Sequence, residues 1–212
     1  MKVLITAGPT YEPIDPVRFI GNRSSGKMGF AIAEAFAAKN IDVLLIAGPV
    51  QLQTVSPRID RIDIESASDM YQAVVQNFKD YDILVFCAAV ADFTPELVHS
   101  EKIKRKSDDL IIRLRPTQDI AATIGKQKTD KQFLVGFALE TNDEQANAMG
   151  KMQRKNLDMI VLNSLNDKGA GFGYDTNKVT IITRSGETID LPLLPKTEVA
   201  AHIVATILGR FE

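Results

Sequence analysis

Residues 82–90 read Asp-Ile-Leu-Val-Phe-Cys-Ala-Ala-Val, and after the opening aspartate the run is entirely apolar. An apolar run without polar alternation is typical of a parallel strand whose two faces are both covered. Two similar runs precede it, at 3–7 and 42–47, and each ends at a Gly-Pro pair that marks a turn. The pattern therefore predicts a central parallel sheet.

Helical patterns alternate with these strands. Residues 25–39 carry apolar side chains at 28, 30, 32, 33, 36 and 37, the spacing of an amphipathic helix of about four turns. A third strand is expected at 59–64, and Ser66 begins a Ser-Ala-Ser-Asp segment suited to capping a helix over 70–78. This alternation predicts an α/β fold with a doubly wound, Rossmann-like, mostly parallel sheet and helices on both faces.

The composition and periodicity of the sequence change after residue 90. Residues 93–109 are polar and lysine-rich without periodicity, which indicates a long flexible flap. Beyond it the pattern predicts further elements, in chain order: a strand at 110–114, a helix capped by 117–119 and running to about 126, a strand at 133–139, a helix at 142–156 and a strand at 159–163 that closes the parallel set. A mobile glycine-rich turn at 169–173, a β-hairpin extension within about 174–194 and a last helix at 197–208 complete the prediction.

The composition is that of an ordinary globular protein, with 212 residues, 45% hydrophobic and 25% charged. A formal charge of −2 provides no general attraction for nucleic acid, so an anion site must be a local cluster. No apolar run approaches the roughly 18 residues of a membrane span or resembles a signal peptide. The single cysteine, Cys87, suits a reducing compartment. We expect a cytoplasmic protein that binds neither membrane nor nucleic acid.

Residues 22–29, Asn-Arg-Ser-Ser-Gly-Lys-Met-Gly, are the strongest local signal for chemistry. Backbone N–H groups at a helix start, with hydroxyls and a lysine beside them, suit an anion. With Gly21 the segment nearly matches a P-loop, but Met28 stands where a P-loop has the magnesium-binding Ser or Thr. Only Gly26 and Gly29 supply part of the dinucleotide-binding glycine spacing. The alternative is a long connection with a helix cap, although its length favours a functional loop.

Three further features of the sequence each admit a functional and a purely structural interpretation. The cations of residues 101–106, Glu-Lys-Ile-Lys-Arg-Lys, would clamp a polyphosphate or belong to a solvated surface. Asp92 follows a predicted strand end, where it would hold magnesium, a ribose hydroxyl or a base amine, or cap a helix. Lys151 and Lys155 lie four apart on one helix face, so they face an anion or simply the solvent. The two histidines, His99 and His202, are too isolated for a metal site.

Taken together, these segments resemble phosphopantothenate–cysteine ligase over nearly the whole chain. The resemblance rests on motifs at 15–29, 88–93 (Ala-Ala-Val-Ala-Asp-Phe), 101–104, 135–141 (Val-Gly-Phe-Ala-Leu-Glu-Thr) and 154–158 (Arg-Lys-Asn-Leu-Asp). It implies a single ligase domain over 1–212 that uses CTP and Mg²⁺ to join 4'-phosphopantothenate to L-cysteine, through an acyl-cytidylate, in coenzyme A synthesis. Several lysines suit such polyanionic substrates.

The resemblance also implies residue roles. Asn22 matches an asparagine associated with the acyl-nucleotide intermediate, and Lys102 matches a flap lysine needed for activity. The implied nucleotide-binding residues are Phe86, Cys87, Ala88, Asp92, Lys102, Thr117, Gln118, Asp119, Ile120, Phe137, Lys151 and Lys155. Ser24, Ser25, Gly26 and Lys27 are expected to bind the acid substrate or its phosphate. The family often has Asn-Pro-Asp-Ile where this chain has Thr-Gln-Asp-Ile, and no metal ligands are assigned.

The resemblance further implies a homodimer, to which the hairpin contributes, and a functional partner in a flavin-dependent phosphopantothenoylcysteine decarboxylase. We expect either a free-standing ligase or a domain taken from a fusion with that enzyme. Two other classes of function stay open. A nicotinamide-dependent oxidoreductase would need an acidic residue at the end of the second strand, which instead reads Ala47-Gly48-Pro49. A non-catalytic nucleotide-binding module would bind CTP without turnover.

Overall fold

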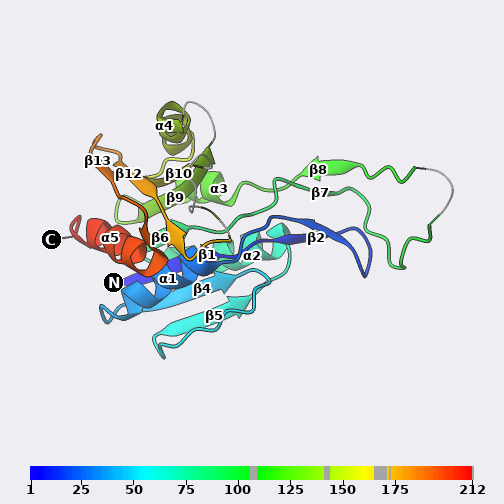
Figure 1. The fold of residues 1–212 in the computed structure, drawn as a ribbon, viewed down its shortest axis with the longest axis horizontal. Helices are drawn as coiled ribbons and strands as arrows, with labels where there is room; N and C mark the ends of the chain where they lie inside the picture. Colours follow the sequence, from blue (N-terminus) through cyan, green and yellow to red (C-terminus); the bar gives the residue numbers. More distant parts are fainter. Residues whose placement is uncertain (106–108, 141–143, 165–170, 172, 212) are drawn as a thin grey trace.

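The computed structural model describes residues 1–105, 109–140, 144–164, 171 and 173–211. Its centre is an eight-stranded sheet in the order β13-β12-β10-β9-β6-β1-β4-β5 (Figure 1). Six of the strands are parallel: β1 Lys2–Ala7, β4 Asp42–Ala47, β5 Ile59–Asp63, β6 Ile83–Phe86, β9 Phe133–Glu140 and β10 Met159–Ser164. Numbered among themselves they follow the order 3-2-1-4-5-6, the dinucleotide-binding arrangement, so the predicted fold class is confirmed.

Helices cover both faces of this sheet. Helices α1 (Lys27–Ala37) and α5 (Lys196–Leu208) share one hydrophobic core with the side of β1 that carries Val3 and Ile5. Helices α2 (Ala67–Asn77), α3 (Ile120–Gln127) and α4 (Glu144–Arg154) share a second core with the side that carries Leu4. A short 3₁₀ turn, η1 (Phe78–Asp80), follows α2. Successive side chains of β1 therefore point alternately into the two cores, as expected for a strand that is buried on both faces.

The run that predicts a strand over 82–90 forms a shorter one. β6 ends at Phe86 because its neighbour β1 ends at Ala7, and Gly8 turns the chain with a φ of 79°. The N–H of Cys87 still reaches the carbonyl of Thr6, and that of Ala89 reaches the carbonyl of Gly8. Small apolar residues beyond Phe86 therefore line the end of the sheet instead of extending it.

The predicted helix starts are close to the observed ones. Ser66 caps α2 in a capping box with Asp69, and Asp119 caps α3 by accepting the N–H of Ala122. α1 begins at Lys27, two residues later than expected, because Gly26 adopts a left-handed φ of 77°. A Cβ on Gly29 would lie 2.5 Å from the Cβ of Ala7, so glycine at this position permits the close packing of α1 on β1.

A projecting arm was not predicted. It consists of two antiparallel ribbons, β2 (Tyr11–Pro13) with β3 (Phe19–Gly21) and β7 (Phe93–Pro95) with β8 (Leu114–Pro116), and β2 lies against β7 (Figure 1). The expected strand at 110–114 is wrong, since the strand begins at Leu114. The region expected to be an unstructured flap is paired at its start, and residues 106–108 lie outside the described part of the chain.

One buried carboxylate holds the arm together. Asp15 accepts the guanidinium of Arg18 and the backbone N–H groups of Val17, Arg18 and Ile103. Arg18 also donates to the carbonyl of Ile103, and the N–H of His99 donates to the carbonyl of Ile14. The Arg18 guanidinium, reinforced by the backbone donors against the effect of burial, holds the pKa of Asp15 far below its usual value. The loop of the β2–β3 ribbon is thus fastened to residues 99–103.

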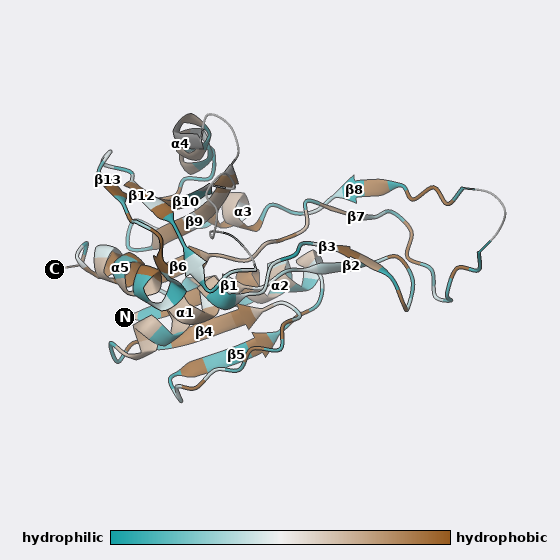
Figure 2. Ribbon diagram, in the orientation of Figure 1, coloured by the Kyte–Doolittle hydropathy of each residue, from teal (hydrophilic) through white to brown (hydrophobic). Residues whose placement is uncertain are grey.

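The arm exposes many apolar side chains, and hydrophobic colour runs along parts of it in Figure 2. Those at least 45% exposed are Val17, Phe19, Phe93, Leu97, Val98, Leu110, Ile111 and Leu114. Tyr11 and Phe19 stack on each other with ring centroids 3.8 Å apart. Contiguous exposed apolar surface on a globular protein marks an interaction site.

The C-terminal region adds the predicted hairpin to the sheet. β12 (Val179–Thr183) pairs antiparallel with β10, and β13 (Thr188–Asp190) pairs with β12 through a turn in which Gly186 has a φ of 90°. Two short strands, β11 (Thr176–Asn177) and β14 (Leu194–Pro195), pair before α5. Most of the glycine-rich turn predicted at 169–173 lies outside the described residues. Within the described part, no helix is both long and apolar enough to cross a membrane.

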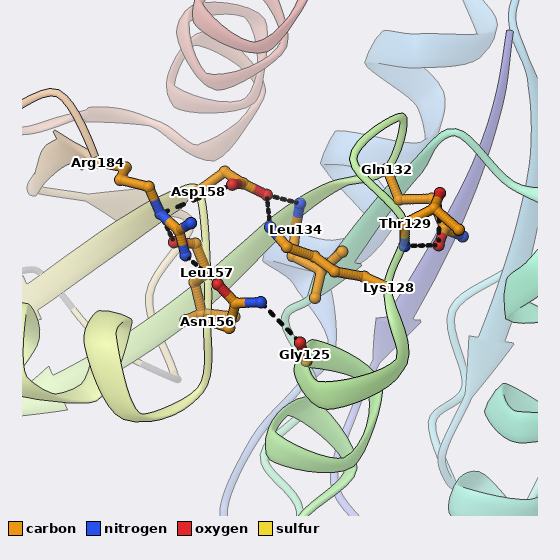
Figure 3. A network of polar contacts seen from close by, with 9 residues as sticks. All are labelled: Gly125, Lys128, Thr129, Gln132, Leu134, Asn156, Leu157, Asp158 and Arg184. Carbon is orange, nitrogen blue, oxygen red and sulfur yellow. Dashed lines mark hydrogen bonds and ion pairs between the residues drawn. The ribbon is translucent and has the colours of Figure 1, made fainter.

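A polar network joins the ends of α3 and α4 near the amino-terminal ends of β9 and β10 (Figure 3). Asp158 accepts from Lys128 at 2.5 Å and from the N–H of Leu134 at 2.8 Å. Asn156, which has a left-handed φ of 51°, donates to the carbonyl of Gly125 and accepts from Arg184. Asn156 and Asp158 of the Arg-Lys-Asn-Leu-Asp motif therefore have a structural role, and they fix the chain directly after α4, next to Lys155.

Candidate functional site

A cavity of about 580 Å³ opens at the carboxyl ends of β1, β6, β9 and β10, beside the start of α1. It includes the point between β1 and β6 where the strand order reverses, the usual ligand position in such folds. Its volume suits a small-molecule substrate. Every predicted site residue except Lys102 lines it, although these residues come from segments far apart in the sequence.

Asn22 lies where the arm joins the sheet. Its side-chain amide donates to the carbonyl of Ala89 at 2.9 Å and to that of Val90 at 3.2 Å. These bonds draw the segment before α1 against the loop after β6. The side-chain oxygen of Asn22 accepts none of the hydrogen bonds found among the described residues, and the residue is exposed at the cavity.

The cavity wall on the α3 and α4 side carries two lysines. Lys155 pairs with the carboxylate of Asp119 at 2.9 Å, and Lys151 donates to the carbonyl of Phe137 at 3.0 Å. Burial opposes the charge of Asp119, but the N–H of Ala122 and the ammonium of Lys155 lower its pKa below the ordinary value. The four residues Thr117, Gln118, Asp119 and Ile120 lie at this wall, with Thr117 bonded through its hydroxyl to the carbonyl of Ala91.

The end of β6 forms the floor of the cavity. The N–H of Ala88 donates to the hydroxyl of Thr6, while Phe86 and Phe137 present aromatic rings from adjacent strands. Desolvation raises the pKa of the Cys87 thiol to about 12, against the opposing effect of Lys196. The thiol therefore stays protonated at neutral pH and provides no nucleophile.

The wall on the α1 and α5 side has a second pair of lysines. Lys27 pairs with Asp175 at 2.6 Å, and the hydroxyl of Ser24 accepts a long bond from the N–H of Gly26. Ser25 is half-buried beside them. Lys196, Asn163 and Asn177 complete this wall, and Asn177 donates to the side-chain oxygen of Asn163 at 3.1 Å.

Sequence reasoning missed the last three of these residues. Asn163 stands at the carboxyl end of a predicted parallel strand, a position at which ligand contacts are expected. Lys196 stands at the start of a predicted helix, where the helix dipole disfavours a cation, and this is a weak signal of another role. Asn177 has no comparable signal, because its position depends on pairing between β11 and β14.

Lys102 does not belong to this cavity in the structure. It is exposed on the arm next to Ile103, whose backbone is bonded to Asp15 and Arg18. Figure 1 shows the arm projecting away from the strand ends that form the cavity. The predicted catalytic role of Lys102 therefore has no support from its position within one chain.

The cavity carries four lysines and two aspartates among its described lining residues. The described residues contain no group of three His, Cys, Asp or Glu side chains placed to hold a metal ion. Asp92 and Asp119 are the two carboxylates at the cavity, and Asp119 is paired with Lys155. This donor set fits a magnesium ion that arrives on nucleotide phosphates and takes at most one or two protein carboxylates.

The family described as DNA/pantothenate metabolism flavoprotein C-terminal domain matches residues 1–210. The chain belongs to this family. The coenzyme A biosynthesis bifunctional protein CoaBC of Bacillus subtilis is 45% identical over 97% of the chain and 50% of its own length. The crystal structure of the C-terminal domain of a CoaBC protein is 43% identical, covers 99% of this chain and 95% of that one, and superposes with a TM-score of 0.84.

Another relative carries a different name. A protein of unknown prokaryotic origin called cysteine/cysteine sulfinic acid decarboxylase is 56% identical over 98% of the chain and 58% of its own length. The chain thus spans about half the length of the curated relatives it matches. The family and the CoaBC relationship confirm the resemblance seen in the sequence.

Proposed function

We propose that the chain is a phosphopantothenate–cysteine ligase that uses CTP and acts in coenzyme A biosynthesis. The observation that carries the proposal is the cavity, because it gathers residues from 22–27, 86–92, 117–120, 137 and 151–155, all expected from the family motifs, around one cationic space. The relationship to the C-terminal domain of CoaBC supports the same activity. Four lysines suit a reaction between a nucleoside triphosphate and a phosphorylated acid.

The first half-reaction joins the acid to the nucleotide. The carboxylate of 4'-phosphopantothenate attacks the α-phosphorus of CTP, and the bond from that phosphorus to the bridging oxygen breaks, so that pyrophosphate leaves with the electron pair. The wall with Lys151 and Lys155 binds the nucleotide and stabilises negative charge on its phosphates. Phe86 and Phe137 offer apolar surface to the base or ribose. Magnesium carried by the triphosphate would supply further charge neutralisation, with Asp92 as the available carboxylate.

The second half-reaction releases the nucleotide. The amine of cysteine attacks the acyl carbon of the mixed anhydride, the bond from that carbon to the phosphate oxygen breaks, and CMP leaves while the amine loses a proton. Asn22 lies at the junction of the segment before α1 and the loop after β6. There its amide orients the activated carboxyl group. Ser24, Ser25, Gly26 and Lys27 bind the acid on the other side of this junction.

We further propose that the enzyme is a homodimer joined through the arm. The exposed apolar side chains on β3, β7, β8 and their loops form a surface that a second copy of the chain would cover. In such a dimer the arm of one subunit carries Lys102 to the cavity of the other. The hairpin β12–β13 is a less suitable interface, because β13 shows polar side chains at Thr188 and Asp190.

The proposal also includes a partner enzyme, a cellular compartment and a domain organisation. The product is the substrate of a flavin-dependent decarboxylase, and the chain works with such an enzyme in the cytoplasm, as one ligase domain over 1–212. The oxidoreductase alternative lacks support, since β4 ends at Ala47 without an acidic residue after it.

Parallel assays test the proposal. Wild-type protein with Mg²⁺, CTP and 4'-phosphopantothenate should release pyrophosphate, and addition of cysteine should give the amide and CMP. Replacing CTP by ATP measures nucleotide preference. Incubation with cysteine alone tests the decarboxylase name of the 56% identical relative. Release of carbon dioxide without nucleotide would refute the ligase, and tight CTP binding without pyrophosphate release would favour a binding module.

A further inference from the structure

Two helices start at the cavity with a lysine. Lys27 is the first residue of α1 and Lys196 is the first residue of α5. Neither helix start has a side-chain cap, and α1 has no acidic residue in its first turn. A helix N-terminus already carries partial positive charge, so each lysine is electrostatically unfavourable at its position. Both helix starts line the same wall of the cavity, which concentrates these positive charges.

Lys196 is the more unusual of the two lysines because only 7% of the residue is exposed. Its ammonium donates to the carbonyls of Gly171 at 2.9 Å and Tyr174 at 2.5 Å, and it forms no ion pair within the described part of the chain. An ammonium has three N–H donors, so one has no acceptor among the described residues. Desolvation, together with the nearby charge of Lys27, lowers the pKa of Lys196. A buried cation of this kind is costly unless an anion compensates it.

Little negative charge compensates the two lysines at this wall, and the carboxylates that are present face the solvent. Asp175 interacts with both lysines: it pairs with Lys27, and its side chain is 87% exposed; Glu198, in the first turn of α5, is also exposed. Such an exposed pair contributes little. The thiol of Cys87, close to Lys196, is neutral because its pKa is raised. This end of the cavity therefore keeps excess positive charge, with the amides of Asn163 and Asn177 beside it.

We propose that Lys196 is a specificity-determining residue that binds the phosphate monoester of the acid substrate, between the starts of α1 and α5. This inference rests on the proposed ligase function and assigns a residue and a second helix to its acid-binding wall. Of the lysines assigned to the nucleotide, Lys151 lies on α4 and Lys155 directly follows it, and α4 packs on the opposite face of the sheet from α1 and α5. The two phosphorylated substrates therefore have separate cationic walls, and Lys196 makes the enzyme select the phosphorylated acid over free pantothenate.

A purely structural role is the competing explanation. The bonds to Gly171 and Tyr174 tie these two residues to the start of α5, and the N–H of Lys196 donates to the carbonyl of Asp175. Loss of that tie would disturb the whole cavity and weaken all ligands together. Loss of a phosphate contact would weaken one ligand and spare the others.

The binding experiment separates these explanations without requiring turnover. Thermal unfolding of wild-type protein, Lys196→Gln and Lys196→Arg is followed with 4'-phosphopantothenate, with pantothenate, or with CTP and Mg²⁺. Lys131→Gln, which removes an exposed lysine away from the cavity, is the matched control. A ligand that binds the folded state raises the unfolding temperature according to its affinity. We expect Lys196→Gln to weaken 4'-phosphopantothenate about 10- to 100-fold, the usual range for a charge-assisted hydrogen bond, while CTP binding changes less than about threefold.

The kinetic experiment uses the same four proteins. The KM for 4'-phosphopantothenate should rise in Lys196→Gln and recover at least partly in Lys196→Arg, with the KM for CTP unchanged. The wild-type preference for the phosphorylated acid over pantothenate should shrink by the same factor. The role of Lys196 is overturned if Lys196→Gln loses affinity for 4'-phosphopantothenate and for CTP equally, or if its preference for the phosphorylated acid over pantothenate is unchanged. If wild-type protein shows no pyrophosphate release yet the phosphate-dependent stabilisation disappears in Lys196→Gln, the ligase proposal fails and the anion site stands.

Discussion

The sheet body and the arm are built in different ways. The body has six parallel strands, most of whose residues are buried, and two cores filled by side chains with almost no exposure. The arm has four strands of three residues each, apolar side chains that face solvent, and the buried carboxylate of Asp15, which joins its two halves. The body is stabilised by its own burial of apolar surface, whereas the arm presents apolar surface that a partner would bury. The cavity belongs to the body, and Lys102 belongs to the arm.

The largest expected effect is on the stability of the body. Phe36 on α1 is completely buried, so Phe36→Ala should lower the free energy of unfolding by about 3–5 kcal/mol. Phe19→Ala on the arm is the comparison in the monomeric chain, where Phe19 is half-exposed and stacks on Tyr11, which predicts a loss of about 1 kcal/mol. Urea denaturation measures both. Equal losses of unfolding free energy would show that arm and body share one cooperative core, which would contradict the difference in construction described above.

The next effect concerns the junction between the two regions. Asn22→Asp removes a donor that reaches the carbonyls of Ala89 and Val90 and places a carboxylate beside those oxygens. We expect acyl-cytidylate to form and amide production to fall about 100-fold or more, because a shift of the segment that positions the activated carboxyl group by about 1 Å can cost that much in rate. Quenched-flow measurement of pyrophosphate and amide separates the two half-reactions. Normal amide formation would exclude Asn22 from the second of them.

The third effect tests whether the arm acts across a dimer. Lys102→Gln should lose pyrophosphate release about 100-fold, as expected for removal of a charge that stabilises the triphosphate. Mixed dimers formed by co-refolding Lys102→Gln with Asn22→Asp should recover roughly one quarter of wild-type activity, since half of the dimers contain one intact site made from both chains. Absence of recovery in verified mixed dimers would place Lys102 over the cavity of its own chain.

The smallest effect is local to the arm. The pKa of Asp15 is lowered in the folded protein, so the ionised carboxylate stabilises the arm at any pH above its unfolded value of about 3.9, and that stabilisation is lost as the pH falls further. The backbone amide of Ile103 donates to this carboxylate. Its NMR signal should stay constant from pH 7 to about 4 and move in more acid solution. A midpoint at or above pH 4 would contradict the assigned role.

The body was largely predictable because its strands and helices carry strong periodic signals. Runs such as 42–47 and 133–139 correspond to β4 and to most of β9, and Ser66 and Asp119 cap helices as expected. The arm was not predictable, because strands of three residues with one half-buried face have no usable period. The exposed apolar residues Leu110 and Ile111 resemble a strand in sequence, yet the pairing begins at Leu114.

The site divides in the same way. Clustered glycine and polar residues identify 22–29 as a candidate site segment, and clustered cations identify 151–155. The structure brings residues from both segments to one cavity. Lys196 is a single lysine after a proline, and only the packing of α5 beside α1 reveals its burial. Lys102 belongs to the most strongly charged segment of the sequence, yet it lies on the arm and away from the cavity. Its position could not be predicted, because a charge pattern carries no information on the direction in which a projecting segment points.

The packing of α5 against α1 also bears on synthesis of the chain. α1 begins at Lys27 and α5 begins at Lys196, far apart in the sequence, yet both supply one wall of the cavity. A nascent polypeptide therefore has every expected nucleotide-binding residue of the body before it has Lys196. Until α5 leaves the ribosome, α1 lacks its covering neighbour and the proposed acid-binding wall is incomplete. The proposed acid-binding wall is thus completed only after α5 has been synthesised.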